Sequence, residues 1–143
     1  MKTRFKFLEH TADAYIEAYG NSLEEAFESA GLAFTDVMTT LETVEAKTEE
    51  TFAVEAQDEE ALLYSWLEEL LLAFELKQML FSSFEVSSIT PTAKGLKLVA
   101  KAWGETYDPE RHVSKVGVKA ATYHQMKIVK DSDGVVLRFL LDI

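Results

Sequence analysis

Cysteine is absent from this sequence of 143 residues. Its absence excludes disulfides, thiolate zinc sites and cysteine nucleophiles. No apolar run approaches the ~20 residues needed to span a bilayer, and the amino-terminal segment lacks the apolar core of a signal peptide. The length predicts a single domain, 1–143, with a core large enough to fold without disulfides.

Basic residues are few: 14 lysines and arginines stand against 25 aspartates and glutamates, a formal net charge of −11. Such a chain is repelled by phosphate backbones, so strong direct binding of nucleic acid is disfavoured. The acids concentrate in residues 42–60, where Lys47 is the only basic residue, whereas residues 111–130 contain no acid. The acidic face is either a solubility device or a surface that steers the protein toward a basic partner.

Catalytic signatures are also missing. The sequence has no glycine-rich phosphate loop, no nucleophile elbow and no paired-histidine zinc motif. The three histidines, His10, His112 and His124, are far apart in the chain. Within its predicted strand, His124 is expected to be a hydrogen-bonded structural histidine. We expect a protein without catalytic residues of its own.

Hydrophobic periodicity predicts an α+β fold. Ser22 and Glu25 form a capping box that begins one helix, which should end near Thr39, and Asp58 caps a second, strongly amphipathic helix. The predicted strands are 4–8, 14–19, 51–56, 84–89, 96–102, 116–129 and 135–142, with a loop at 104–112 and a hairpin turn at 131–134. The expected architecture is a single-domain two-layer sandwich, with two helices packed on a mainly antiparallel sheet.

Two aspartates occupy positions for which folding alone gives little reason. Asp13 interrupts a strand-like segment, and Asp142 closes the apolar run 135–141. Aspartate is depleted in strands because its short side chain competes for backbone hydrogen bonds. If the chain ends meet, these carboxylates and the terminal oxygens of Ile143 converge near His10, a plausible seat for a hard cation. The alternative is that each aspartate is a turn former or a solvated terminus.

Lys119 also has two interpretations. On the predicted strand 116–129 it shares a face with Gly117, Ala121 and Tyr123, opposite the face of His124. It is either a solvated lysine or, if that face meets a partner, a contact residue beside the acidic site. A metal-dependent hydrolase built on the two aspartates remains a further alternative.

The chain resembles the archease family along almost its whole length. Each matching motif is weak alone, but their order, spacing and presence at both termini make the match specific. The motifs are Phe7-Leu8-Glu9-His10-Thr11-Ala12-Asp13, Tyr19-Gly20, Leu23-Glu24-Glu25-Ala26-Phe27, Phe34-Thr35-Asp36-Val37-Met38, Leu62-Leu63-Tyr64-Ser65-Trp66-Leu67-Glu68-Glu69-Leu70, Gly104-Glu105-Thr106-Tyr107-Asp108, Val118-Lys119-Ala120-Ala121-Thr122-Tyr123 and Leu141-Asp142-Ile143.

The resemblance implies a cytoplasmic accessory protein of tRNA processing. Archeases promote guanylylation and multiple turnover of the RtcB-type tRNA-splicing RNA ligase and can broaden its use of nucleotides. A chaperone-like role toward a tRNA cytosine-5 methyltransferase is the alternative. An acidic activator suits a ligase that must itself be basic to hold RNA.

The resemblance also implies the site residues. The family's metal ligands correspond to Asp13, Asp142 and Ile143, and its functionally important lysine corresponds to Lys119. Ala121 replaces a larger β-branched residue in the motif around that lysine, which is a minor departure. His10 is either a ligand or a support for one. The expected cation is calcium, with magnesium or manganese as alternatives.

Overall fold

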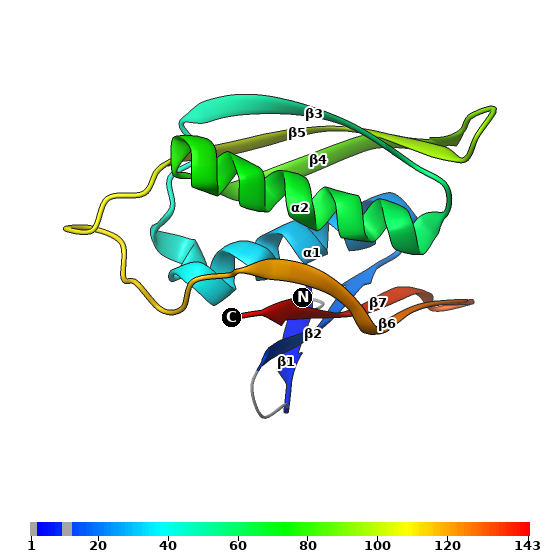
Figure 1. Ribbon diagram of the computed structural model, residues 1–143, viewed down its shortest axis with the longest axis horizontal. Helices are drawn as coiled ribbons and strands as arrows, with labels where there is room; N and C mark the ends of the chain where they lie inside the picture. Colours follow the sequence, from blue (N-terminus) through cyan, green and yellow to red (C-terminus); the bar gives the residue numbers. More distant parts are fainter. Residues whose placement is uncertain (1–2, 10–12) are drawn as a thin grey trace.

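The computed structural model describes residues 3–9 and 13–143 (Figure 1). His10 lies outside the described residues. The elements in chain order are β1 (Phe5–Leu8), β2 (Asp13–Gly20), α1 (Leu23–Met38), a 3-10 turn (Leu41–Thr43), β3 (Thr48–Ala56), α2 (Glu59–Lys77), β4 (Met79–Pro91), β5 (Leu96–Thr106), β6 (Ala120–Asp131) and β7 (Gly134–Asp142).

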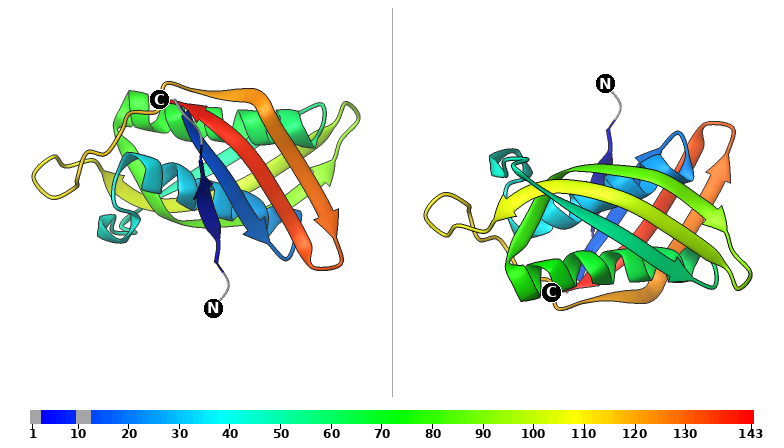
Figure 2. Two further views of the ribbon diagram at one scale, coloured as in Figure 1. Left: turned by 90° about the horizontal axis from the view of Figure 1, so that it is seen from below. Right: turned by 90° about the horizontal axis from the view of Figure 1, so that it is seen from above.

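The strands form two antiparallel sheets, ordered β1-β2-β7-β6 and β3-β5-β4. Both helices lie between the sheets, and the outer faces of the sheets are not covered by a helix (Figures 1 and 2). The predicted α+β class, with two helices on antiparallel strands, is confirmed. The predicted two layers are corrected to three, because the strands divide between two sheets and each helix is packed on both sides.

Helix α1 begins where the capping box predicts. The Glu25 amide donates to Ser22 Oγ at 3.1 Å, and the Glu25 carboxylate accepts from the Asn21 amide at 3.0 Å. The helix spans the space between the sheets, so it contacts β2 and β4 on opposite sides. Its Thr35 hydroxyl donates to the Phe81 carbonyl on β4 at 2.6 Å, which satisfies polar groups inside the core.

Helix α2 is the centre of the core. Asp58 caps it by accepting from the Ala61 amide at 2.8 Å, and Gln78, in the left-handed conformation with φ 54°, ends it. Trp66 is fully buried, and its indole N–H donates to the Phe27 carbonyl at 3.0 Å. A fully buried leucine or phenylalanine contributes about 2 kcal/mol, so the two helices and inner sheet faces supply most of the folding free energy.

The strand boundaries differ from the prediction at two places. Strand β4 begins at Met79 instead of residue 84 and includes Pro91, because bulges after Phe81 and Val86 interrupt its alternation. Strand β5 continues to Thr106, so the connecting loop runs from 107 to 119 instead of 104 to 112.

Strand β6 is shorter than predicted and is irregular. It begins at Ala120, four residues after the predicted start, and its register with β7 shifts between Thr122 and Lys127. Gln125 has a φ of 59° within this bulge. The alternation of side chains continues through the bulge as though the strand were continuous. The prediction that alternate residues from 116 to 126 share one face was therefore wrong.

Among the described residues, no helix is long and apolar enough to cross a membrane.

Candidate metal centre

Asp13 and Asp142 are direct cross-strand neighbours. Strands β2 and β7 run antiparallel, and Asp13 is opposite Asp142 in their register. Residues opposite each other in such a pair project from the same face with Cβ atoms ~5 Å apart. The predicted convergence of the two aspartates is therefore present in the backbone.

The apolar pattern of the two strands fixes this register. Ile16 and Ala18 on β2, and Leu137, Phe139 and Leu141 on β7, are fully buried toward the helices. Side chains alternate along a strand, so a slip of one residue would expose this set. The same alternation directs Asp13 and Asp142 to the outer face, near the end of the sheet.

Ile143 and Lys119 lie at the same strand end. Ile143 follows Asp142 directly and is half-buried against the core. The Lys119 amide donates to the Asp142 carbonyl at 2.7 Å, while the Lys119 side chain is exposed. Lys119 thus precedes β6 instead of lying within a strand, and the hydrogen bond holds it beside the two aspartates.

A shallow pocket adjoins Asp13 and adds two residues that the sequence analysis did not select. Asp36, near the end of α1, and Lys115, from the 107–119 loop, line it together with Phe7 and Val116. Lys115 Nζ donates to the Asp36 carbonyl at 3.0 Å and lies 3.4 Å from its carboxylate. Asp36 lies in the motif Phe34-Thr35-Asp36-Val37-Met38, which the chain shares with the family that it resembles. That motif is the sequence signal that could have pointed to Asp36.

The donor set suits a hard cation, but side chains of the described residues do not complete it. No group of three histidine, cysteine, aspartate or glutamate side chains able to hold a metal occurs within residues 3–9 and 13–143. The two aspartates provide carboxylate oxygens, the ligands calcium and magnesium prefer. A third ligand can be a main-chain or terminal oxygen, as predicted for Ile143, another side-chain oxygen, or a group outside the described residues.

A separate polar network occupies the same face of the sheet. Glu17 accepts from Arg138 Nε at 2.6 Å and from the Tyr19 hydroxyl, and Lys6 lies 3.6 Å away. Burial raises the pKa of Glu17, but the hydrogen bonds and the two cations outweigh burial and lower it. Burial and the bond to Glu17 raise the pKa of Tyr19 to about 12.

His112 is buried and belongs to a second polar network. The Asp108 amide donates to His112 Nδ1 at 2.8 Å, so Nε2 carries the proton and donates to Glu105 at 2.9 Å. His124 is exposed in the β6 bulge, where its backbone amide donates to Thr122 Oγ1 at 3.0 Å. Its expected role as a hydrogen-bonded structural histidine stays a prediction.

Glu105 is the hub of this second network. Its carboxylate also accepts from Arg111 and from the Glu45 amide. Burial raises the pKa of Glu105, but these three hydrogen bonds and the Arg111 charge bring it down to about 2. The network ties the 107–119 loop to the end of β5 and so supports the segment that carries Lys115 and Lys119.

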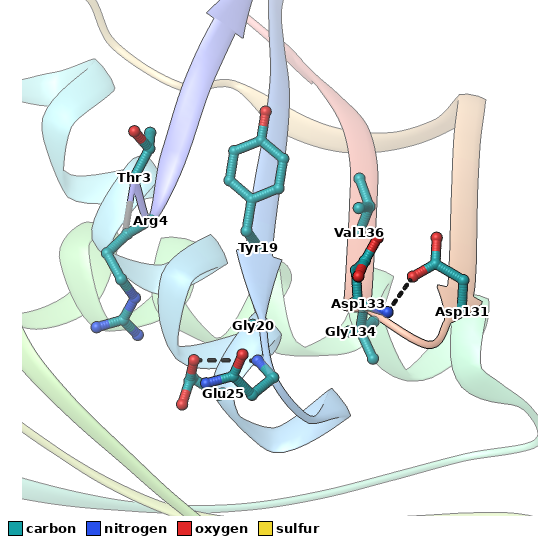
Figure 3. A pocket seen from close by; sticks show the side chains of 11 residues that line it. Thr3, Arg4, Tyr19, Gly20, Glu25, Asp131, Asp133, Gly134 and Val136 are labelled. Atoms are coloured by element: carbon teal, nitrogen blue, oxygen red, sulfur yellow. Dashed lines mark hydrogen bonds between the residues drawn. The ribbon is translucent and has the colours of Figure 1, made fainter. Parts of the chain in front are cut away.

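A pocket of about 440 Å³ lies at the opposite end of the β1-β2-β7-β6 sheet. Tyr19, Gly20 and the 131–134 hairpin turn line it, with Arg4 on its other side (Figure 3). Asp13, Lys119, Asp142 and Ile143 do not line it, so the candidate centre and this pocket are distinct places.

Comparison with known proteins matches this arrangement to one family. The model of the Archease protein family matches residues 5–143. "Protein archease" of Pyrococcus abyssi is 50% identical over 92% of both chains, and that of Sulfurisphaera tokodaii is 45% identical over 98% of this chain and 99% of the relative. The solution structure of Methanobacterium thermoautotrophicum protein 1598 superposes with a TM-score of 0.85 at 41% identity, covering 98% and 99% of the two chains. The chain therefore belongs to the archease family.

Proposed function

We propose that this protein activates an RtcB-type tRNA-splicing RNA ligase by promoting its guanylylation and repeated turnover, and that it widens the ligase's choice of nucleotide. It acts in the cytoplasm as a protein cofactor of the ligase and catalyses no reaction itself. A divalent cation, calcium first and magnesium or manganese as alternatives, is held by Asp13, Asp142 and the main-chain or terminal oxygens of Ile143.

The observation that carries the proposal is the register of Asp13 against Asp142 at the exposed ends of β2 and β7. Like charges directly opposite each other destabilise a strand pair. A bound cation offsets that cost and presents positive charge at the tip of an otherwise acidic protein. Such a charge serves where a nucleotide's phosphates must be stabilised during transfer.

Lys119 has a defined role in this arrangement. Its backbone is fixed by the hydrogen bond to Asp142, and its ammonium group extends from the same strand end into solvent. A lysine placed there can contact a carboxylate of the ligase or a nucleotide phosphate. His10, beside Asp13 in the chain, either ligates the cation or orients a ligand.

The net charge of −11 supports the partner class. A ligase that binds RNA carries a basic surface, and opposite charge accelerates docking of an acidic protein. The same charge keeps the activator from competing for RNA.

A ligation assay with RNA in excess over the ligase, GTP and a divalent cation tests the proposal. We expect product beyond one turnover per ligase only when this protein is present. The Asp13→Asn and Asp142→Asn variants should lose that stimulation, whereas Asp133→Asn, in the exposed hairpin turn at the other end of β7, should retain it. Stimulation by Lys119→Met should also fall, with partial recovery in Lys119→Arg.

Full stimulation by folded Asp13→Asn and Asp142→Asn variants would contradict the metal-tip mechanism. If the folded wild-type protein fails to stimulate the ligase at all, ligase activation is wrong, and the methyltransferase partner implied by the resemblance becomes the function to test.

A further inference from the structure

Helix α2 has apolar side chains on its solvent side as well as on its buried side. Leu72 is 44% exposed and Leu76 is 78% exposed, the largest exposed fraction among the large apolar residues of the described chain. Neither contributes to the core cluster formed by Leu67, Leu70 and Leu71. Folding does not explain the two leucines, so they are candidates for an interface.

These leucines line a groove between α2 and β3. Its floor and walls include Phe52 and Ala53 from β3 and Leu72, Ala73 and Leu76 from α2. Phe52 packs edge-to-face on Trp66 and Phe81, which makes this wall rigid. The right view of Figure 2 shows the free side of β3 facing α2, with the two elements diverging from the turn that joins them.

Strand β3 is an edge strand with an open side. It pairs with β5 alone among the described strands. The other edge of the same sheet, β4, is capped by α1: Glu28 accepts from the Val86 amide at 2.9 Å, and Thr35 donates to the Phe81 carbonyl. Among the hydrogen bonds of the described residues, no side chain caps the backbone of β3 in this way. An open edge beside an apolar helix face is the geometry of strand addition.

The negative charge around the groove favours a basic binding partner. The segments that border the groove, residues 48–56 and 68–77, contain six glutamates and one lysine. Of these, Glu50, Glu69 and Lys77 line the groove itself. That lysine, Lys77, is already paired with Glu50 at 2.7 Å. Two copies of this edge would repel each other, whereas lysine or arginine side chains of another protein would be attracted.

We propose that the β3–α2 groove binds an extended, basic segment of a partner protein, which adds as a fourth strand to the free edge of β3. Backbone hydrogen bonds to β3 supply affinity. Alternate apolar side chains of the segment cover Leu72 and Leu76, and its intervening basic side chains pair with glutamates such as Glu49 and Glu69.

This inference is independent of the metal site. The groove belongs to the β3-β5-β4 sheet, whereas Asp13 and Asp142 belong to the other sheet. A protein that cannot bind the cation should still bind the segment, and loss of the groove should leave cation binding unchanged.

Selection from a displayed library of random twelve-residue peptides tests the inference. The bait is the 143-residue chain. Peptides that also bind the Leu72→Gln/Leu76→Gln variant are removed by counter-selection. The matched control is Val129→Thr, which changes an exposed valine on β6. We expect enrichment of peptides that alternate apolar residues with lysine or arginine. The wild type and the Val129→Thr control should bind a synthetic copy of an enriched peptide equally, and Leu72→Gln/Leu76→Gln at least about tenfold more weakly.

The site of binding distinguishes strand addition from simple charge attraction. Peptide binding should slow amide hydrogen exchange within Thr48–Ala56, and an analogue with serine at the apolar positions should bind weakly. Equal binding of the serine analogue, equal binding by the Leu72→Gln/Leu76→Gln variant, or no enrichment over the counter-selection would overturn the proposal. A dimer of the free protein that dissociates in this variant would also overturn it, because a second copy would then occupy the groove.

Discussion

Strands β2 and β7 carry two charged pairs on one face, and the pairs are opposite in kind. Glu17 stands opposite Arg138, and the two side chains form a 2.6 Å hydrogen bond. Asp13 stands opposite Asp142 at the end of the same ladder. The first pair satisfies its own charges within the fold. The second places two negative charges together, which is where the proposed cation would bind.

The comparison separates acids whose charge the fold neutralises from acids that the fold places opposite a like charge. Glu105 belongs with Glu17, because Arg111, His112 and a backbone amide surround it. Two aspartates opposite each other in a strand pair repel, and this repulsion lowers the stability of the pair. In the proposed function, a bound hard cation offsets the repulsion.

Replacing one aspartate of the second pair by a basic residue should have the largest effect on cation binding. Asp142→Arg converts the aspartate pair into an ion pair like Glu17–Arg138. We expect cation affinity and ligase stimulation to fall at least about tenfold, while the free energy of unfolding rises by about 0.5 kcal/mol. Calorimetric metal titration and urea unfolding measure the two quantities. Retained cation binding would show that Asp142 is not a ligand.

Removing the hub of the second network should reduce stability without changing cation affinity. Glu105→Gln leaves the buried His112 facing an amide and removes the ion pair of Arg111 with Glu105, at a cost of about 2 kcal/mol. Glu49→Gln, on the exposed neighbouring strand, is the control and should change the free energy of unfolding by less than about 0.5 kcal/mol. If Glu105→Gln lowers the free energy of unfolding as little as the control does, the network does not stabilise the fold.

The same variant tests the acid limb of the stability curve. The folded-state pKa of Glu105 is about 2, below its ordinary value of 4.5. Its contribution is therefore complete above pH 4.5 and is lost as the pH falls toward 2. The free energy of unfolding of the wild type should fall through this pH window, and that of Glu105→Gln should fall less. An equal fall in both proteins would show that other groups cause the sensitivity to acid.

The Glu17 network should show a smaller effect, at alkaline pH. Tyr19 has a pKa of about 12 in the fold against an ordinary value of 10, so the stability it adds is present below pH 10 and is lost as the pH rises through 12. In Glu17→Gln the phenol should titrate closer to 10, and unfolding should cost about 1 kcal/mol less. Absorbance titration of the tyrosines checks the shift, with Tyr19→Phe identifying the transition.

Local sequence patterns were sufficient for most of the elements. The cap residues Ser22 and Asp58 located both helix starts, and the Asp131–Gly134 turn located the last hairpin. The meeting of Asp13 with Asp142 was one of two interpretations that the residues left open, and the family resemblance favoured it over a turn or a solvated terminus.

Features that depend on distant contacts could not be predicted. The bulge at Gln125 leaves the alternation of apolar residues intact, so no local signal marks it. The division into two sheets depends on β5 pairing on both sides, and the Glu105–His112 contact depends on a reversal of the chain. Exposure of Leu76 follows only from the position of α2 between the sheets.

Calcium titration of the purified protein, followed by calorimetry, tests the central claim most directly. Wild type and the Asp133→Asn control should bind one divalent cation with the same affinity and gain thermal stability from it. Asp13→Asn/Asp142→Asn should bind calcium at least about tenfold more weakly and gain no thermal stability from it. Equal calcium binding by this double variant would contradict the assignment of the aspartate pair as a metal centre.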